Sequence, residues 1–170
     1  MPKIIIAYVK YVDYVTDKLG KSCMYLVLIM IAILLLNAIT RNVINYPLSW
    51  CIQMAQFTMT AYYFLGGAYT LKSDDHVRMD LIYDNLSEKG KAKMDMFTST
   101  FLMTYLICLL IGSISSAAYS IKYNQKLFSQ WNPSVVPIKV IMVIGISLMI
   151  LQVISLFFKD YAKVKGKPIT

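Results

Sequence analysis

Four long stretches of this chain contain no charged residue, and they set the main constraint on its fold. They cover residues 22–40, 42–71, 96–121 and 140–158 and hold 19, 30, 26 and 19 residues. At about 1.5 Å of rise per residue, the shortest of them extends roughly 29 Å as a helix, close to the hydrocarbon thickness of a bilayer. The sequence therefore predicts an all-α membrane protein with four transmembrane helices.

The composition agrees with this class. Of the 170 residues, 58% are hydrophobic and 15% are charged, which excludes a disordered tail or an ordinary soluble domain. A formal net charge of +8 would suggest nucleic acid as the partner of a soluble protein. Here the charges lie outside the apolar stretches, so we expect no nucleic-acid partner.

The predicted organisation has three parts. Residues 1–21 place apolar side chains at steps of three and four with charges between them, which is typical of an amphipathic interfacial helix. A simple extension of the first span is the alternative. Residues 22–158 are expected to form the four-helix bundle, and residues 159–170 a basic cytoplasmic tail. The predicted spans are about 22–40, 49–71, 96–121 and 138–158.

The distribution of Lys and Arg predicts the orientation. Thirteen lie in residues 1–21, 72–95 and 159–170, whereas four lie in the connections on the other side. Because short loops rich in Lys and Arg are retained in the cytoplasm, we expect both termini there.

The second stretch carries a continuous polar stripe at steps of four and three residues. Amide side chains facing lipid without partners are costly, so the stripe is expected to face protein, either within this chain or on another. The stripe consists of Ser49, Gln53, Gln56, Thr60, Tyr63, Gly67 and Thr70. Trp50, near its start, suits the outer membrane interface.

Groups for catalysis or ion coupling are missing from the spans. No Asp, Glu, Arg or His occurs in the four uncharged stretches, which argues against a proton-coupled exporter. The single His76 lies in a charged loop, so axial haem ligation and a zinc site are not expected. The three Cys residues show no CxxC spacing and are expected to be free thiols. We expect no enzyme, no cofactor and no metal site.

Three segments together resemble the DctQ-like small membrane subunit of tripartite ATP-independent periplasmic (TRAP) transporters. They are the run from Arg41 to Trp50, the Leu65-Gly66-Gly67-Ala68 patch, and His76-Val77-Arg78-Met79-Asp80. The resemblance extends from about Arg41 to Leu156.

Later motifs look like the branch of this family that is labelled for mannitol or chloroaromatic compounds. They are Trp131-Asn132-Pro133, Pro137-Ile138-Lys139 and Gln152. The chain departs from the family pattern at Cys51-Ile52-Gln53, where many relatives have acidic residues.

The resemblance implies a multi-pass protein of the bacterial inner membrane, in contact with membrane lipids. Its partners would be a large elevator-type membrane subunit and a periplasmic substrate-binding protein. The small subunit would brace the large one and help to dock the binding protein, during sodium-driven uptake of small organic acids.

Three groups of residues are candidate sites. The first is the stripe, with Trp50, as the surface against the large subunit. The second is the cytoplasmic loop motif of His76, Arg78 and Asp80, in which His76 and Asp80 are four residues apart and can pair on one helical face. A solvated loop whose charges only fix the topology is the alternative.

The third group lies on the outer side and is a candidate for docking the binding protein. It comprises Lys122, Lys126, Trp131 and Lys139. Lysines that extend to the headgroups and an interfacial Trp explain the same residues.

Two other functions share the compositional features of the chain. One is a free-standing membrane structural or assembly protein without a transport partner. The other is a self-contained channel, which would need to oligomerise through the stripe on the second span.

Overall fold

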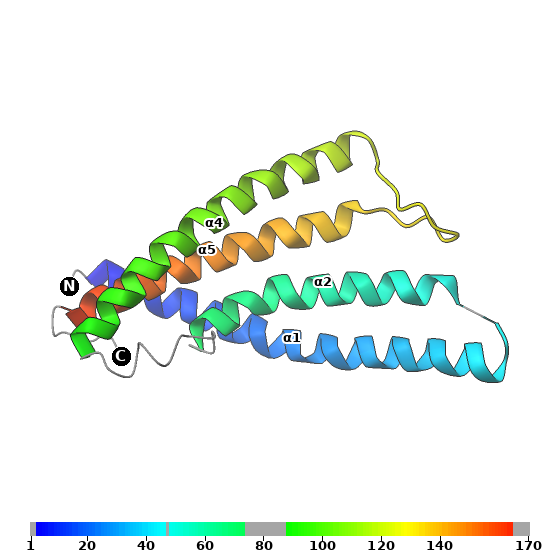
Figure 1. Ribbon diagram of the computed structural model, residues 1–170, viewed down its shortest axis with the longest axis horizontal. Coiled ribbons are helices and arrows are strands. Elements are labelled where there is room, and N and C mark those ends of the chain that lie inside the picture. The colour runs from blue at the N-terminus through cyan, green and yellow to red at the C-terminus, as the bar shows by residue number, and fades with distance from the viewer. Residues whose placement is uncertain (1–2, 47, 74–87, 165–170) are drawn as a thin grey trace.

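The computed structural model describes residues 3–46, 48–73 and 88–164, and these residues form four long helices. They are α1 (Lys3–Val43), α2 (Ser49–Lys72), α4 (Glu88–Lys122) and α5 (Val136–Val164). Consecutive helices run in opposite directions, so the start of α1 and the end of α5 lie at the same end of the bundle (Figure 1). We call this the terminal end, and we call the opposite end, with the α1–α2 and α4–α5 connections, the loop end. The predicted all-α class is confirmed.

Within the described residues, three helical segments are long and apolar enough to cross a membrane. They are Ile5–Val43, Lys93–Lys122 and Val136–Ala162. Helix α2 has 24 residues, which is sufficient length, but its Gln, Thr and Tyr residues lower its hydropathy. A fourth crossing by α2 and the orientation of the termini therefore stay predictions.

Helix α1 joins the predicted interfacial helix to the predicted first span without a break. Its 41 residues extend about 60 Å, roughly twice the hydrocarbon thickness of a bilayer. This continuity matches the alternative of a simple extension. A position of the first half at the membrane surface remains a prediction.

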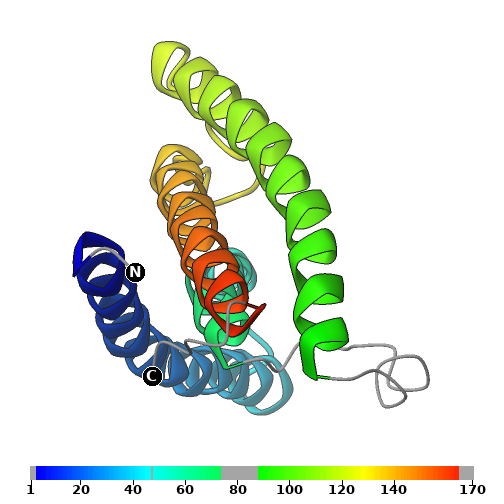
Figure 2. The ribbon, with the colours of Figure 1, turned by 90° about the vertical axis from the view of Figure 1, so that its left-hand side faces the viewer.

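Helix α5 is the central element, because it packs against each of the other three helices. Viewed from the terminal end, it lies between α1 and α4, with α2 behind it (Figure 2). The buried core at these contacts consists of Leu71, Leu106, Ile146 and Val153. Helix α4 packs chiefly against α5, which leaves much of its surface exposed.

Two glycines let the helices approach closely. A Cβ atom added at Gly145 of α5 would lie 2.7 Å from the carbonyl oxygen of Phe64 in α2. Gly20 of α1 lies directly against the ring of Tyr69 in α2. Small residues at such crossings are typical of membrane helices, which gain van der Waals contact when their backbones come close.

Helix α5 continues to Val164, past the predicted end of the last span at residue 158. The first part of the predicted basic tail is thus helical. The remaining tail, residues 165–170, lies outside the described residues.

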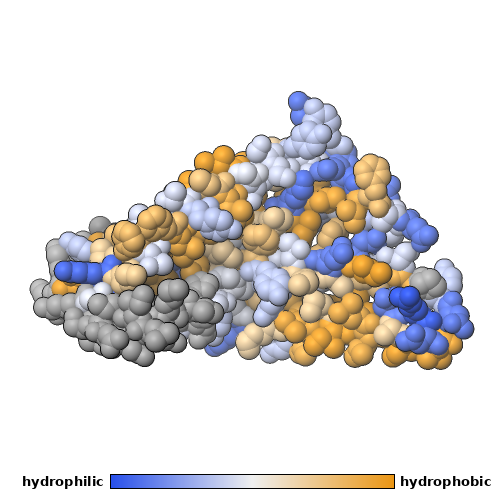
Figure 3. Space-filling view, viewed as in Figure 1, coloured by the Kyte–Doolittle hydropathy of each residue, from blue (hydrophilic) through white to orange (hydrophobic). Residues whose placement is uncertain are grey.

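The exposed surface is apolar along α1 and more polar at the loop end (Figure 3). Exposed apolar side chains of α1 include Leu28, Leu35 and Ile39. A surface of this kind is suited to lipid or to neighbouring membrane helices.

Candidate functional site

The predicted polar stripe of α2 divides between two sides of the helix. Gln56 and Tyr63 are exposed, beside the exposed apolar side chains of Ile52 and Met59. Gln53 instead has a buried side-chain oxygen that lacks a hydrogen-bond partner. The two amides, three residues apart, are therefore in different environments.

Other members of the stripe contact their own chain. Gly67 lies directly against the side chain of Met149 in α5. The Thr60 hydroxyl donates to the Gln56 carbonyl oxygen at 2.8 Å, and the Thr70 hydroxyl donates to the Gly66 carbonyl oxygen at 3.2 Å. Hydroxyls bonded to their own helix need no further partner.

At the start of the stripe, Ser49 is half-buried and Trp50 is 36% exposed. The residues of α2 that are buried within this chain are mostly small: Cys51, Ala55, Ala61, Ala68 and Leu71. Intrachain packing therefore accounts for part of α2, and the exposed side with Gln56 and Tyr63 remains open to a second chain.

The loop motif of His76, Arg78 and Asp80 lies outside the described residues. The predicted pairing of His76 with Asp80 stays a prediction.

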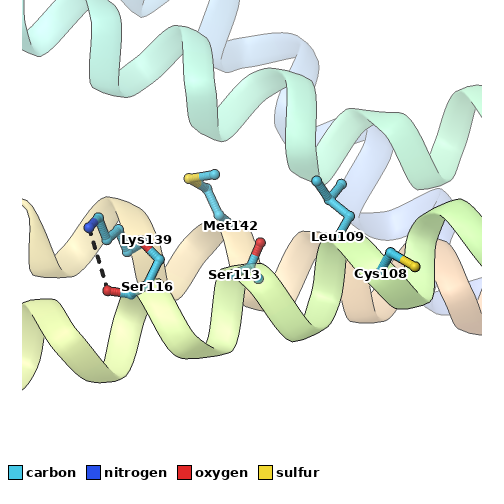
Figure 4. Close-up of a pocket in the computed structure, with 7 residues that line it drawn as sticks. Cys108, Leu109, Ser113, Ser116, Lys139 and Met142 are labelled. Carbon is cyan, nitrogen blue, oxygen red and sulfur yellow. Dashed lines mark hydrogen bonds between the residues drawn. The ribbon is translucent and has the colours of Figure 1, made fainter.

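The four residues of the predicted docking group have different surroundings. The Lys139 ammonium group donates to the Ser120 hydroxyl of α4 at 2.6 Å and to the side-chain oxygen of Gln125, in the α4–α5 connection, at 3.0 Å. It also reaches the backbone carbonyl of Ser116 at 3.5 Å (Figure 4). Lys139 thus ties α5 to α4.

The other three members lie in or beside the α4–α5 connection. The Lys122 ammonium lies 5.6 Å from the centre of the Tyr123 ring, a cation–π distance. Lys126 forms an isolated antiparallel bridge with Ser134, and Trp131 is 42% exposed. These three remain available at the loop end.

A hydrogen-bonded network joins α1 to α5 at the terminal end. The Gln152 side chain is fully buried; its oxygen accepts from the Thr16 hydroxyl at 2.9 Å, and its nitrogen donates to Asp13 Oδ1 at 3.0 Å. Lys159 donates to the other oxygen, Asp13 Oδ2, at 2.6 Å. Both carboxylate oxygens of Asp13 are therefore bonded to α5.

Lys72 extends this network to α2. Its ammonium forms an ion pair with Asp17 and donates to the backbone carbonyl oxygen of Asp13 at 3.3 Å. Two carboxylates thus face two ammonium groups across three helices. Hydrogen bonds to charged groups in a partly desolvated site are stronger than the same bonds in water. The terminal-end network consists of Asp13, Thr16, Asp17, Lys72, Gln152 and Lys159.

Sequence reasoning missed this network. The pattern predicts Asp13 and Asp17 on the polar side of an interfacial helix and places Lys159 in the tail. One signal was available, because Gln152 is the only amide side chain in residues 140–158 and a buried amide needs partners.

Comparison with protein families gives a match over most of the chain. The family described as "Tripartite ATP-independent periplasmic transporters, DctQ component" matches residues 30–163. No curated protein matches the sequence. The matched range begins within α1 and includes all of α2, α4 and nearly all of α5.

Proposed function

This chain belongs to the DctQ family of TRAP transporter components, and from that premise we propose that it braces the large membrane subunit during uptake of small organic acids. The family match is the observation that carries the proposal. The absence of Asp, Glu, Arg and His from the four uncharged stretches supports a bracing role, because ion coupling within a membrane normally needs such groups.

Purification tests the proposal. The full chain, tagged and extracted from its native membrane in mild detergent, should bring with it a stoichiometric large permease, identified by mass spectrometry. Recovery of the chain alone in several detergents would contradict the bracing role. That result would favour a free-standing structural protein.

The exposed side of α2 is our candidate surface for the large subunit. Gln56 and Tyr63 support this assignment, since both are exposed among apolar neighbours where a second membrane helix can pack. Gln56→Leu should lower the ratio of large subunit to this chain after purification.

Gln53→Leu is the matched control. Its side-chain oxygen is buried and unpaired, so its removal should not destabilise the bundle and should leave that ratio unchanged. An unchanged ratio in Gln56→Leu, or an equal loss in both variants, would contradict this surface.

We place docking of the periplasmic binding protein at the loop end, with Lys122, Lys126 and Trp131. Their positions at the end of α4 and in the α4–α5 connection, and the exposure of all three, support this surface. A variant with both Lys122→Glu and Lys126→Glu should lose binding of the binding protein while the membrane complex stays assembled. Unimpaired docking would overturn the assignment.

The loop motif is proposed to hold the α2–α4 connection together through a pair between His76 and Asp80. His76→Ala should then reduce the yield of the complex or its transport rate. If the yield of the complex and the transport rate are both unchanged, the charges of the loop only fix the topology.

Sodium coupling and the substrate class rest on the family. Proteoliposomes that contain both membrane subunits and the binding protein should accumulate a radiolabelled organic acid only under an inward sodium gradient. Accumulation of the organic acid without a sodium gradient would contradict sodium coupling. Reporter fusions at each terminus test the inner-membrane location with both termini in the cytoplasm.

A further inference from the structure

An open pocket of about 250 Å³ lies between α4 and α5 in the half of the molecule toward the loop end. Its lining is chiefly apolar, with Leu109, Gly112 and Ser113 from α4 and Met142 from α5 (Figure 4). Gly112 adds to the open space, since a Cβ atom there would meet nothing within 4 Å. Lys139 is the only charged residue in the lining.

Along the helices, the lining of the pocket extends over most of the thickness of one membrane leaflet. Cys108 lines it near the middle of the uncharged stretch 96–121, and Ser116 lines it nearer the loop end. Eight residues of helix extend about 12 Å, close to half of the roughly 30 Å hydrocarbon core. The ammonium of Lys139 bonds to the Ser116 carbonyl, at the end of the pocket nearer the membrane surface.

Within the described residues, the charge of Lys139 has no acidic counterpart in the half of the molecule toward the loop end. Its three hydrogen-bond acceptors are the neutral oxygens of Ser116, Ser120 and Gln125. The sequence contains no Asp or Glu in residues 18–73 or 96–159, which include both connections at the loop end. Among the residues that the structure describes, the basic side chains at the loop end therefore have no carboxylate partner.

We propose that this pocket binds an anionic phospholipid, with one acyl chain along Leu109, Gly112 and Met142 and the phosphate group at Lys139. The apolar lining suits the acyl chain. At its end the Lys139 ammonium carries a positive charge with only neutral acceptors, and a phosphate oxygen would replace the longest of them, the Ser116 carbonyl at 3.5 Å. The proposal is independent of the transporter role, because it needs only α4 and α5 in a membrane.

Lipid titration tests the proposal on the purified full chain, together with the large subunit if the two copurify. Phosphatidylglycerol and phosphatidylcholine are added separately to delipidated protein, and bound lipid is counted by native mass spectrometry. We expect one phosphatidylglycerol per chain, bound more tightly than phosphatidylcholine. Lys139→Gln should weaken phosphatidylglycerol binding about tenfold, which is the scale of one lost charge-assisted contact.

Gly112→Leu provides an independent variant, because its side chain would fill the space of the acyl chain. It should weaken both lipids. Each variant has a matched control away from the pocket. Lys122→Gln removes a loop-end ammonium that does not line the pocket, and Gly66→Leu adds the same side chain at another open glycine, in α2. Both controls should bind phosphatidylglycerol as the unmodified chain does.

Three results would overturn the proposal. Equal affinities for the two lipids in the unmodified chain would mean ordinary lipid solvation. Full phosphatidylglycerol binding in both Lys139→Gln and Gly112→Leu would place any lipid elsewhere. Loss of the large subunit from Gly112→Leu with unchanged phosphatidylglycerol binding would assign the pocket to a protein helix. Copurification of the large subunit with the unmodified chain is a separate readout, so failure of the bracing role is distinguishable from failure of the lipid site.

Discussion

At the terminal end of the bundle, side chains from α1, α2 and α5 meet in one network, whereas at the loop end polar contacts stay within a helix pair or a connection. Asp13 and Asp17 face Lys72 and Lys159 at the terminal end. In the described part of the loop end, we find no hydrogen bond between the α1–α2 pair and the α4–α5 pair, and Lys139 bonds only within its own pair. The terminal-end network thus pairs two carboxylates with two ammonium groups where three helices meet, whereas Lys139 at the loop end bonds only to neutral oxygens.

The two ends are therefore suited to different roles, positioning of the helices at one end and association with other molecules at the other. A network that satisfies its own charges fixes the relative positions of the helices without help from another molecule. Unbalanced lysines at the other end favour association with anionic groups of lipids or proteins. The following changes test this comparison, starting with the largest expected effect.

Asp13→Ala should destabilise the bundle most. The change leaves Lys159 and Gln152 without their acceptor, and we expect the free energy of unfolding to fall by about 2 to 3 kcal/mol. The expected cost takes into account that the Asp13 and Lys159 side chains keep 20% and 22% exposure. Thermal unfolding in detergent, followed by circular dichroism, measures it.

Asp13→Asn is the control for that change, since it keeps an oxygen acceptor and the shape of the side chain. Its loss should be smaller. A shift for Asp13→Ala of less than about 0.5 kcal/mol, the scale of ordinary surface substitutions, would show that the network does not hold the terminal end.

Gly145→Ala tests the contact between the two helix pairs. The new methyl group would lie 2.7 Å from the Phe64 carbonyl oxygen, so α2 and α5 must move apart, at a cost of about 1 to 2 kcal/mol. Gly66→Ala meets nothing within 4 Å and should be neutral or stabilising, because Ala favours helix. The difference between their melting temperatures is the measurement, and equal temperatures would refute the close crossing.

Gln152→Leu should have a moderate effect. It removes the hydrogen bonds to Thr16 and Asp13 but retains an apolar side chain of similar size, so we expect a loss of about 1 kcal/mol. A double variant with Asp13→Ala should lose less than the sum of the two single changes, because the residues share one network. Additive losses in the same thermal assay would mean that the two residues act separately.

Lys122→Gln should have the smallest effect. Its ammonium lies over the adjacent Tyr123 ring and joins no other helix, so stability should change by less than about 0.5 kcal/mol. Chemical denaturation in detergent checks this value. A loss of stability as large as that of Gln152→Leu would contradict the proposed difference between the two ends.

The boundaries of the helices followed largely from the positions of charged residues. The second span was predicted over residues 49–71, and α2 runs from Ser49 to Lys72. The first and last helices are longer than the spans predicted over 22–40 and 138–158. Helix α1 begins already at Lys3, with Gly20 packed against Tyr69, and α5 continues past residue 158 to Val164, with Lys159 bonded to Asp13.

The candidate sites were less predictable than the helices. A periodic stripe such as that of α2 shows which residues lie on one face of a helix. It does not show which part of that face is covered by a neighbouring helix, so the sequence could not distinguish the buried Gln53 oxygen from the exposed Gln56. The bonds between α1 and α5 in the terminal-end network join residues 136 to 146 positions apart. Such pairs depend on the packing of α1 against α5, which no local pattern encodes.

The central position of α5 has a consequence for biogenesis. Ribosomes make α5 last of the four helices, so Asp13 and Thr16 enter the membrane region long before Gln152 and Lys159 exist to pair with them. Among the described helices made before α5, α1 packs chiefly against α2, which supplies Lys72 as a partner for Asp17. Insertion of the final helix is therefore the step that converts a hairpin into a closed bundle, and a chain that stops before it exposes unpaired polar groups to membrane quality control.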